Sequence, residues 1–215
     1  MDHDSYGAGP GPGQPDRLRP VAAMVSGTWL LEAAVDYLMA AAGRTTTLLL
    51  DAPTPCQAWD LRLLLRHVAD SMAVLAEAIT AGAIGLDPGP DRASPLADPL
   101  PMVRCRAAGL LSACAAAGCA ERAVIIGDRE LPASMTAVAG ALEVAVHGWD
   151  IAAACGRSEP IPPMLAALLL PVAPVLITPA SRPGLFADPL SLAAASAPGD
   201  ELVAFTGRQP RAACG

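Results

Sequence analysis

The sequence predicts an all-α protein built as a four-helix bundle, and three observations favour this class. Hydrophobic residues make up 53% of the 215 positions, which is enough to form a sizeable core in one domain. Ala and Leu dominate the apolar stretches and aromatic residues contribute only 3%, so closely packed helices are favoured over strands. Four long segments also show helical spacing of apolar residues, separated by connections rich in Gly, Pro and Asp.

We expect a disordered leader over residues 1–20 and one helical domain over residues 21–210. The leader is polar and rich in Gly and Pro, a composition that cannot bury enough apolar surface to become ordered. The first helix is expected over residues 21–42, because apolar side chains recur on one broad face and Gly43 follows. The next segment, residues 45–59, contains two prolines and is predicted to be a connector.

Capping residues indicate where the second and third helices begin and end. Asp60 is a candidate N-cap for the second helix, which we expect to stop at Gly82, since glycine suits the left-handed backbone that follows many helices. A linker rich in Gly, Pro and Asp comes next. Asp98 and Pro99 then predict the start of a third, Ala- and Leu-rich helix that reaches Ala117.

The C-terminal half is predicted to contain a short extended segment, a fourth long helix and several short helices. β-branched residues within 122–131 favour extended backbone before a Gly-Asp turn. The fourth long helix is expected from about Ala133 to Gly156. Prolines interrupt the apolar stretch that follows Pro160, and a last short helix is expected near residues 200–206.

Composition argues against several classes of protein. The formal net charge is −7, and the fourteen basic residues are all Arg and form no cluster, so we expect no nucleic-acid-binding surface. The longest apolar run, residues 164–177, is shorter than the roughly 20 residues that a transmembrane helix needs, so we expect no membrane span. The six cysteines lack paired CxxC spacing and no secretory signal begins the sequence, which favours the cytoplasm.

Three residues could form a metal site. Glu143 and His147 are four residues apart, so they lie on one face of the fourth helix and can chelate one ion. If the second and fourth helices face each other, His67 supplies a third ligand, and a His₂Glu set leaves coordination positions open for water or substrate. A bound ion lowers the pKa of a coordinated water or thiol. The same spacing also suits an internally hydrogen-bonded pair without a metal.

Two segments of the sequence resemble a known family. TPCQAWDLRLLLRH (residues 54–67) and LEVAVHGWD (residues 142–150) are similar to the second- and fourth-helix signatures of the DinB-like superfamily, in particular the N-terminal domain of mycothiol-dependent maleylpyruvate isomerase. A looser resemblance extends over about residues 20 to 210. It implies a DinB-like four-helix bundle with additional short C-terminal helices, and a divalent metal held by counterparts of His67, Glu143 and His147.

The resemblance also implies an activity. Zinc is the metal expected first, with nickel as an alternative, and the family uses a low-molecular-weight thiol in isomerisation or transfer, so mycothiol is a possible co-substrate. We therefore expect a thiol transferase or isomerase that acts on a small electrophilic molecule. The open alternatives are a metal-free cyclase or isomerase of specialised metabolism and a non-catalytic bundle that binds a small molecule. Apolar helix faces also make a homodimer possible.

Five further residues could contribute to the site. Arg66 and Trp149 are the candidates for contacts with a thiol cofactor, and Trp59 could wall the pocket or only fill space. Asp150 could accept a hydrogen bond from a ligand imidazole or be a solvated carboxylate at a helix end. Cys56 precedes a helix N-terminus, where thiolates are favoured, although a free cysteine is more often a small buried group.

Overall fold

The structure is a computed structural model, and it describes residues 27–56, 59–84, 98–117, 123–126, 129–193 and 195–210. The expected leader, residues 1–20, and the first residues of the expected first helix lie outside the described residues. Most of the described chain is helical, which confirms the predicted fold class.

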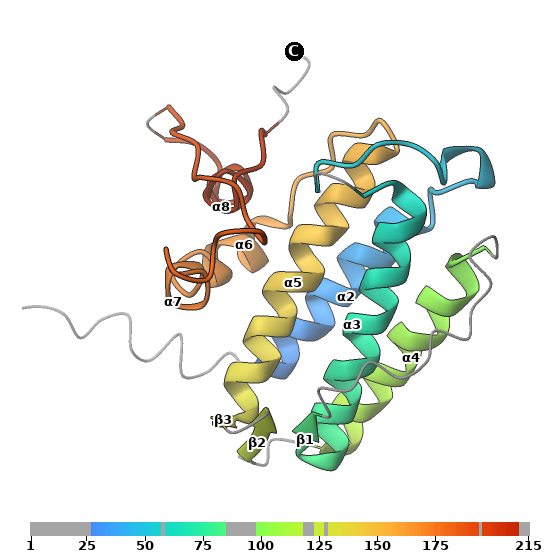
Figure 1. Cartoon of the computed structure of the whole chain (residues 1–215), viewed down its shortest axis with the longest axis vertical. Coiled ribbons are helices and arrows are strands. Elements are labelled where there is room, and N and C mark those ends of the chain that lie inside the picture. Colours follow the sequence, from blue (N-terminus) through green and yellow to red (C-terminus); the bar gives the residue numbers. More distant parts are fainter. Residues whose placement is uncertain are drawn as a thin grey trace, which may run out of the picture.

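Four long helices lie side by side as a bundle (Figure 1). Helix α2 packs mainly on α5, while α3 packs on both α4 and α5. The side chains between them are almost all aliphatic, and several of the largest are fully buried, among them Leu31, Leu38 and Leu65. The bounds of these helices are α2, Gly27–Ala42; α3, Leu61–Ala81; α4, Leu100–Ala117; and α5, Ala133–Ala154.

The predicted caps are formed. The Asp60 carboxylate accepts a hydrogen bond from the Leu63 N–H at 2.8 Å, which satisfies one of the amides that the first turn of α3 leaves without a helical partner. Gly82 ends α3 in the left-handed conformation, with φ of 69°. The Asp98 carboxylate accepts from the Leu100 N–H at 3.0 Å and begins α4. The predicted ends of these two helices are therefore confirmed.

A small sheet lies at one end of the bundle (Figure 1). Strands β2 (Ala123–Ile126) and β3 (Arg129–Pro132) pair in antiparallel fashion, as the extended segment in the sequence suggested, and β1 (Ala83–Ile84) adds a parallel partner that was not predicted. Because β1 follows α3 directly and β3 leads directly into α5, α3 ends and α5 begins at the sheet. The two helices therefore run in opposite directions.

Short helices form a C-terminal subdomain beside α2 and α5 (Figure 1). The predicted interrupted helix is two helices, α6 (Pro163–Leu169) and α7 (Ala173–Leu176), and the predicted last helix is α8 (Pro198–Phe205). Helices α6 and α8 pack on each other, and α6 also contacts α2 and α5. Leu165, Leu169 and Leu202 are fully buried, so the bundle core continues into this subdomain. One 3₁₀ turn, η1 (Thr47–Leu49), lies in the connector before α3.

Helix α5 is the central helix of the molecule. It is long and apolar enough to cross a membrane by length and composition alone, and 78% of its most apolar window is buried inside the structure. Burial of this kind is typical of a core helix that packs against neighbours on several sides, here α2, α3 and α6.

Candidate metal centre

The antiparallel arrangement of α3 and α5 brings His67 level with His147. Fourteen residues separate His67 from the end of α3 at the sheet, and fourteen separate His147 from the start of α5 at the same sheet. With a helical rise of about 1.5 Å per residue, both imidazoles lie roughly 21 Å from that end of the bundle. The third residue, Glu143, lies on the same face of α5 as His147, one turn closer to the sheet.

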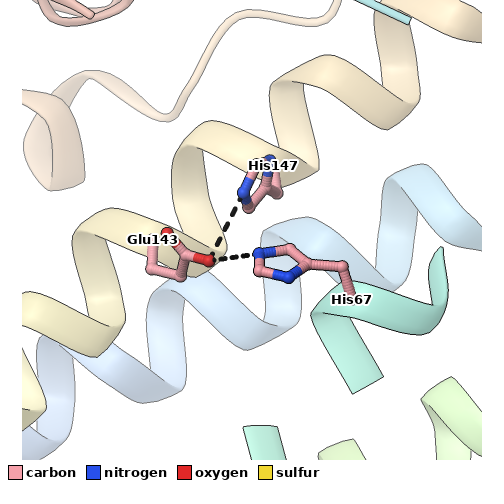
Figure 2. Close-up of side chains that lie close together, drawn as sticks. All are labelled: His67, Glu143 and His147. Atoms are coloured by element: carbon pink, nitrogen blue, oxygen red, sulfur yellow. Dashed lines mark hydrogen bonds and ion pairs between the residues drawn. The ribbon is translucent and has the colours of Figure 1, made fainter. Parts of the chain in front are cut away.

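The three side chains converge on one point (Figure 2). Glu143 Oε1 lies 2.8 Å from His67 Nε2 and 3.3 Å from His147 Nε2. One ligand atom from each residue lies within 4.8 Å of the other two. Ser71, one turn after His67 on α3, donates a hydrogen bond to the same Glu143 oxygen at 3.3 Å. The predicted triad is therefore assembled as a compact cluster.

Two glycines let α5 approach its neighbours at the height of this cluster. A Cβ atom at Gly140 would lie 2.7 Å from the side chain of Leu75 on α3. A Cβ atom at Gly148 would lie 3.0 Å from the ring of Tyr37 on α2. Contacts this short are tighter than nearly all real Cβ contacts, so a larger residue at either position would force its neighbour to shift.

A buried carboxylate orients His147. Asp150 is fully buried, and its Oδ2 lies 3.0 Å from His147 Nδ1, so the Nδ1–H donates to the carboxylate and Nε2 turns toward Glu143. Arg208, which follows α8, holds Asp150 from the other side with two bonds of 2.8 Å, one from Nε to Oδ1 and one from Nη2 to Oδ2. Such a partner fixes the tautomer and the ring orientation of a metal-ligating histidine.

The charges of these groups stabilise one another. Burial alone favours the neutral form of Glu143, but hydrogen bonds from His147 and His67 lower its pKa well below the ordinary value. Burial also acts to lower the pKa of His147, yet bonds to Asp150 and Glu143 raise it to about 9. The pKa of Asp150 is lowered despite burial, by hydrogen bonds from His147 and Arg208. Both carboxylates are therefore ionised at neutral pH.

The cluster opens into a cavity of about 710 Å³. Helices α3 and α5 form one wall, and the segment from Leu176 to Ala187 forms the other. Arg182 holds this second wall in place, because its Nη1 donates to the carbonyl oxygens of Ala187 and Phe205 at 2.6 and 3.2 Å. The lining residues are Pro55, Cys56, Trp59, His67, Ala139, Leu142, Glu143, Val146, His147, Leu176, Ile177, Gly184, Leu185, Phe186, Ala187, Thr206, Gly207 and Arg208.

Some of the other candidate residues lie in this cavity and others do not. Trp59 lines it, with its ring centroid 4.5 Å from that of His67. Cys56 lines it too, but burial raises the pKa of its thiol, which disfavours the reactive thiolate. Arg66 and Trp149 are not among the lining residues. Trp149 is 7% exposed and follows His147 by two positions, about 200° around the helix, so it packs in the core. Cofactor contacts by Arg66 and Trp149 stay predictions.

Sequence reasoning did not assign roles to the residues of the C-terminal wall or to Arg208. The partner of Arg208 lies 58 positions earlier in the chain, and no spacing rule connects two residues so far apart. Phe186 and Ile177 lie in a stretch without helical periodicity. A Gly-Arg pair directly after a predicted helix was the available signal, and it says nothing about which carboxylate the arginine meets.

The donor set suits a divalent ion of borderline softness. Two imidazole nitrogens and one carboxylate oxygen are the ligand types that bind zinc and nickel. Within the described part of the chain, the cluster holds no fourth His, Cys, Asp or Glu. Three ligands of this kind leave coordination positions open on the cavity side. The residues present therefore fit a bound metal with an open site.

Comparison with known proteins identifies the family of the chain. Residues 31–152 match the family described as the mycothiol maleylpyruvate isomerase N-terminal domain. The chain is also similar to two uncharacterized proteins of Mycobacterium tuberculosis, from strains CDC 1551 / Oshkosh and ATCC 25618 / H37Rv, each 30% identical over 175 residues. Each alignment covers 75% of this chain and 86% of the relative. No solved structure matches the chain. The chain belongs to the mycothiol maleylpyruvate isomerase N-terminal domain family.

Proposed function

We propose that this protein is a metal-dependent enzyme that acts on a small electrophilic molecule. His67, Glu143 and His147 hold a divalent ion, zinc first and nickel as the alternative, and a mycothiol-like thiol or water is the activated group. The observation that carries this proposal is the convergence of three ligand atoms within 4.8 Å at the wall of a 710 Å³ cavity. Family membership favours a thiol transfer or an isomerisation over other chemistry.

When bound, the ion supplies Lewis acidity that lowers the pKa of a coordinated thiol or water. The protein positions the two histidine ligands. Asp150 holds the Nδ1–H of His147 at 3.0 Å, which leaves Nε2 as the ligand atom. Trp59 covers the ring of His67. Ile177 and Phe186 add apolar side chains to the cavity lining.

A specific observation favours a second candidate. Glu143 Oε1 already accepts a hydrogen bond from His67 and lies 3.3 Å from His147 Nε2, so the cluster is satisfied without an ion. In this case the protein is a metal-free cyclase or isomerase of specialised metabolism, or a bundle that binds a small molecule without turnover. The two candidates differ in metal content, which one experiment measures.

The test is elemental analysis of the purified, untagged chain beside His67→Ala, Glu143→Gln and His147→Ala. We expect about one zinc or nickel ion per chain in the wild type and loss of at least about tenfold in each variant. Glu77→Gln is the matched control, because Glu77 is an exposed carboxylate on the same helix as His67, and it should retain the ion. A wild type that holds no metal and cannot be loaded with any divalent ion contradicts the metal proposal.

Location and assembly complete the proposal. The free cysteines of the described chain, Cys56, Cys105, Cys114 and Cys155, are in keeping with a reducing cytoplasm. A small molecule is the partner expected in the cavity. Homodimer formation stays a prediction, and light scattering coupled to size-exclusion chromatography measures it.

A further inference from the structure

The cavity beside the triad is lined by a few polar residues and many apolar ones. The polar lining consists of the triad together with Thr206 and Arg208. The apolar lining from the C-terminal segment includes Leu176, Ile177, Leu185 and Phe186. A ligand that fills this space therefore meets polar atoms at the triad and mostly carbon atoms elsewhere.

Arg208 already forms a buried ion pair within the chain. Its Nε and Nη2 donate to Asp150, both at 2.8 Å, and its Nη1 donates to the carbonyl oxygen of Thr206 at 3.3 Å. All three guanidinium nitrogens thus have partners within the chain. Besides the two imidazoles, Arg208 is the sole cationic side chain among the lining residues that the structure describes. A second carboxylate group on a ligand, placed away from the triad, would lose its hydration without gaining an unpaired cationic side chain from the lining residues.

Phe186 and Ile177 also separate the cavity from a neighbouring one. Both residues line a second cavity of about 510 Å³, together with Pro174, Arg182, Asp188 and Phe205 among others. The two side chains therefore stand between the two spaces.

From these features we propose that the cavity takes an uncharged, mostly apolar small molecule with a single polar group directed toward the triad, and that Phe186 limits its length. The inference rests on the proposed function for the role of the polar group, which meets the reacting centre. It names the electrophilic substrate as an apolar compound, such as an aromatic or branched aliphatic one, and excludes di- and tricarboxylates.

The test compares two probes by isothermal titration calorimetry on the full chain, stripped of metal with a chelator, at pH 7. We expect one molecule of 2-naphthol to bind per chain, at least about tenfold more tightly than maleate. Leu185→Asp should weaken 2-naphthol binding by about tenfold or more, because it places a carboxylate in the apolar wall. Val175→Asp is the matched control. Leu185 and Val175 are 70% and 64% exposed, so neither change disturbs the core, and Val175 does not line the cavity.

A second variant tests the length limit. Phe186→Ala should shift the preference from 2-naphthol toward the longer 4-phenylphenol by about threefold or more, because it opens the way into the second cavity. An unchanged preference overturns the role of Phe186. Maleate binding as tightly as 2-naphthol, or 2-naphthol binding that Leu185→Asp leaves unchanged, overturns the substrate class.

These outcomes are independent of the metal. If 2-naphthol binds as expected and no divalent ion can be loaded, the metal-dependent function fails and the apolar site stands. If the ion binds stoichiometrically and maleate is preferred, the apolar site fails and the metal-dependent function stands.

Discussion

At the scale of single residues, the buried line Arg208–Asp150–His147 links the C-terminal subdomain to the candidate metal centre. Each contact in it is between 2.8 and 3.0 Å, and Asp150 has no solvent exposure. A buried carboxylate that loses its cationic partner is strongly destabilised. Arg208 is therefore a positioning residue for His147, although it belongs to no part of the triad.

Replacing this arginine should weaken metal binding. We expect Arg208→Gln to lower the affinity for zinc by about 10- to 100-fold, because Asp150 then holds the imidazole less firmly. The measurement is competition with a chromogenic chelator at pH 7. Arg157→Gln is the control, since Arg157 pairs with Glu159 at an exposed site, and it should leave the affinity unchanged. Equal affinities in both variants would show that the triad needs no support from the C-terminal subdomain.

The triad itself was predictable, and the reason is local. The i,i+4 spacing of Glu143 and His147 places both on one helix face whatever the rest of the chain does. His67 needed the additional assumption that two helices face each other. For Asp150 the sequence allowed either a hydrogen bond to His147 or a solvated carboxylate, because i,i+3 spacing permits the bond without requiring it. Arg208 could not be assigned, since its place depends on how a distant segment packs.

At the scale of secondary-structure elements, the turn after α8 determines where Arg208 lies. Gly207 has φ of 81°, and a Cβ atom there would lie 2.7 Å from both the carbonyl oxygen and the Cβ of Ala187. Glycine is required both for the left-handed backbone and for this close approach. The turn thus joins the end of α8 to the apolar wall of the cavity.

We expect Gly207→Ala to lower the free energy of unfolding by about 2 kcal/mol or more, because left-handed strain and a backbone clash add together. Urea denaturation followed by circular dichroism measures this. Two other glycines separate the causes. Gly156 also has positive φ, but an added Cβ there would meet no atom within 4 Å. Gly156→Ala should therefore lower the free energy of unfolding by only about 1 kcal/mol. Gly109→Ala lies on an open face of α4 and should stabilise the protein by about 0.5–1 kcal/mol. Equal effects at positions 207 and 156 would contradict the clash.

Element boundaries were predictable where a cap defines them. The two aspartates, Asp60 and Asp98, accept hydrogen bonds from N–H groups two or three residues later, and Gly82 adopts the left-handed conformation. These local effects depend on the residue type alone, so they can be predicted from the sequence. Strand β1 has only two residues, which is too short for any periodic pattern. Its pairing with β2 depends on the ends of α3 and α5 meeting, which is a property of the packed bundle.

At the scale of the whole molecule, the triad makes stability depend on pH. In the metal-free protein the pKa of His147 is raised from 6.5 to about 9, so the folded state binds a proton that the unfolded state releases. The resulting stabilisation is fully present below pH 6.5 and is lost as the pH rises through 9. It amounts to at most about 3 kcal/mol, from 1.36 kcal/mol per pKa unit.

We therefore expect the melting temperature of the metal-free wild type to fall between pH 6.5 and 9 more steeply than that of His147→Gln. Differential scanning calorimetry across this range measures both. Saturating zinc should remove the difference in slope, because a metal-bound imidazole nitrogen no longer takes up the proton. Parallel slopes in the metal-free wild type and variant would mean that His147 is not protonated in the folded state.

The bundle was predictable as a whole because apolar periodicity, composition and helix caps all pointed to it. The second wall of the cavity was not. Residues 176–187 have little regular secondary structure, and their position follows from Arg182 and from α6 packing on α8. Contacts of that kind arise only after the elements have assembled.

The salt bridge between Asp150 and Arg208 has a consequence for protein engineering. It joins positions inside and outside the matched region, residues 31–152. A chimera that combines the first 160 residues of this chain with the C-terminal segment of a relative exchanges the apolar wall and leaves the triad in place. Such a hybrid keeps its histidine oriented only if the incoming segment supplies a guanidinium at the position of Arg208. A chimera designed to change substrate preference should therefore exchange the segment from Asp150 to Arg208 as one piece.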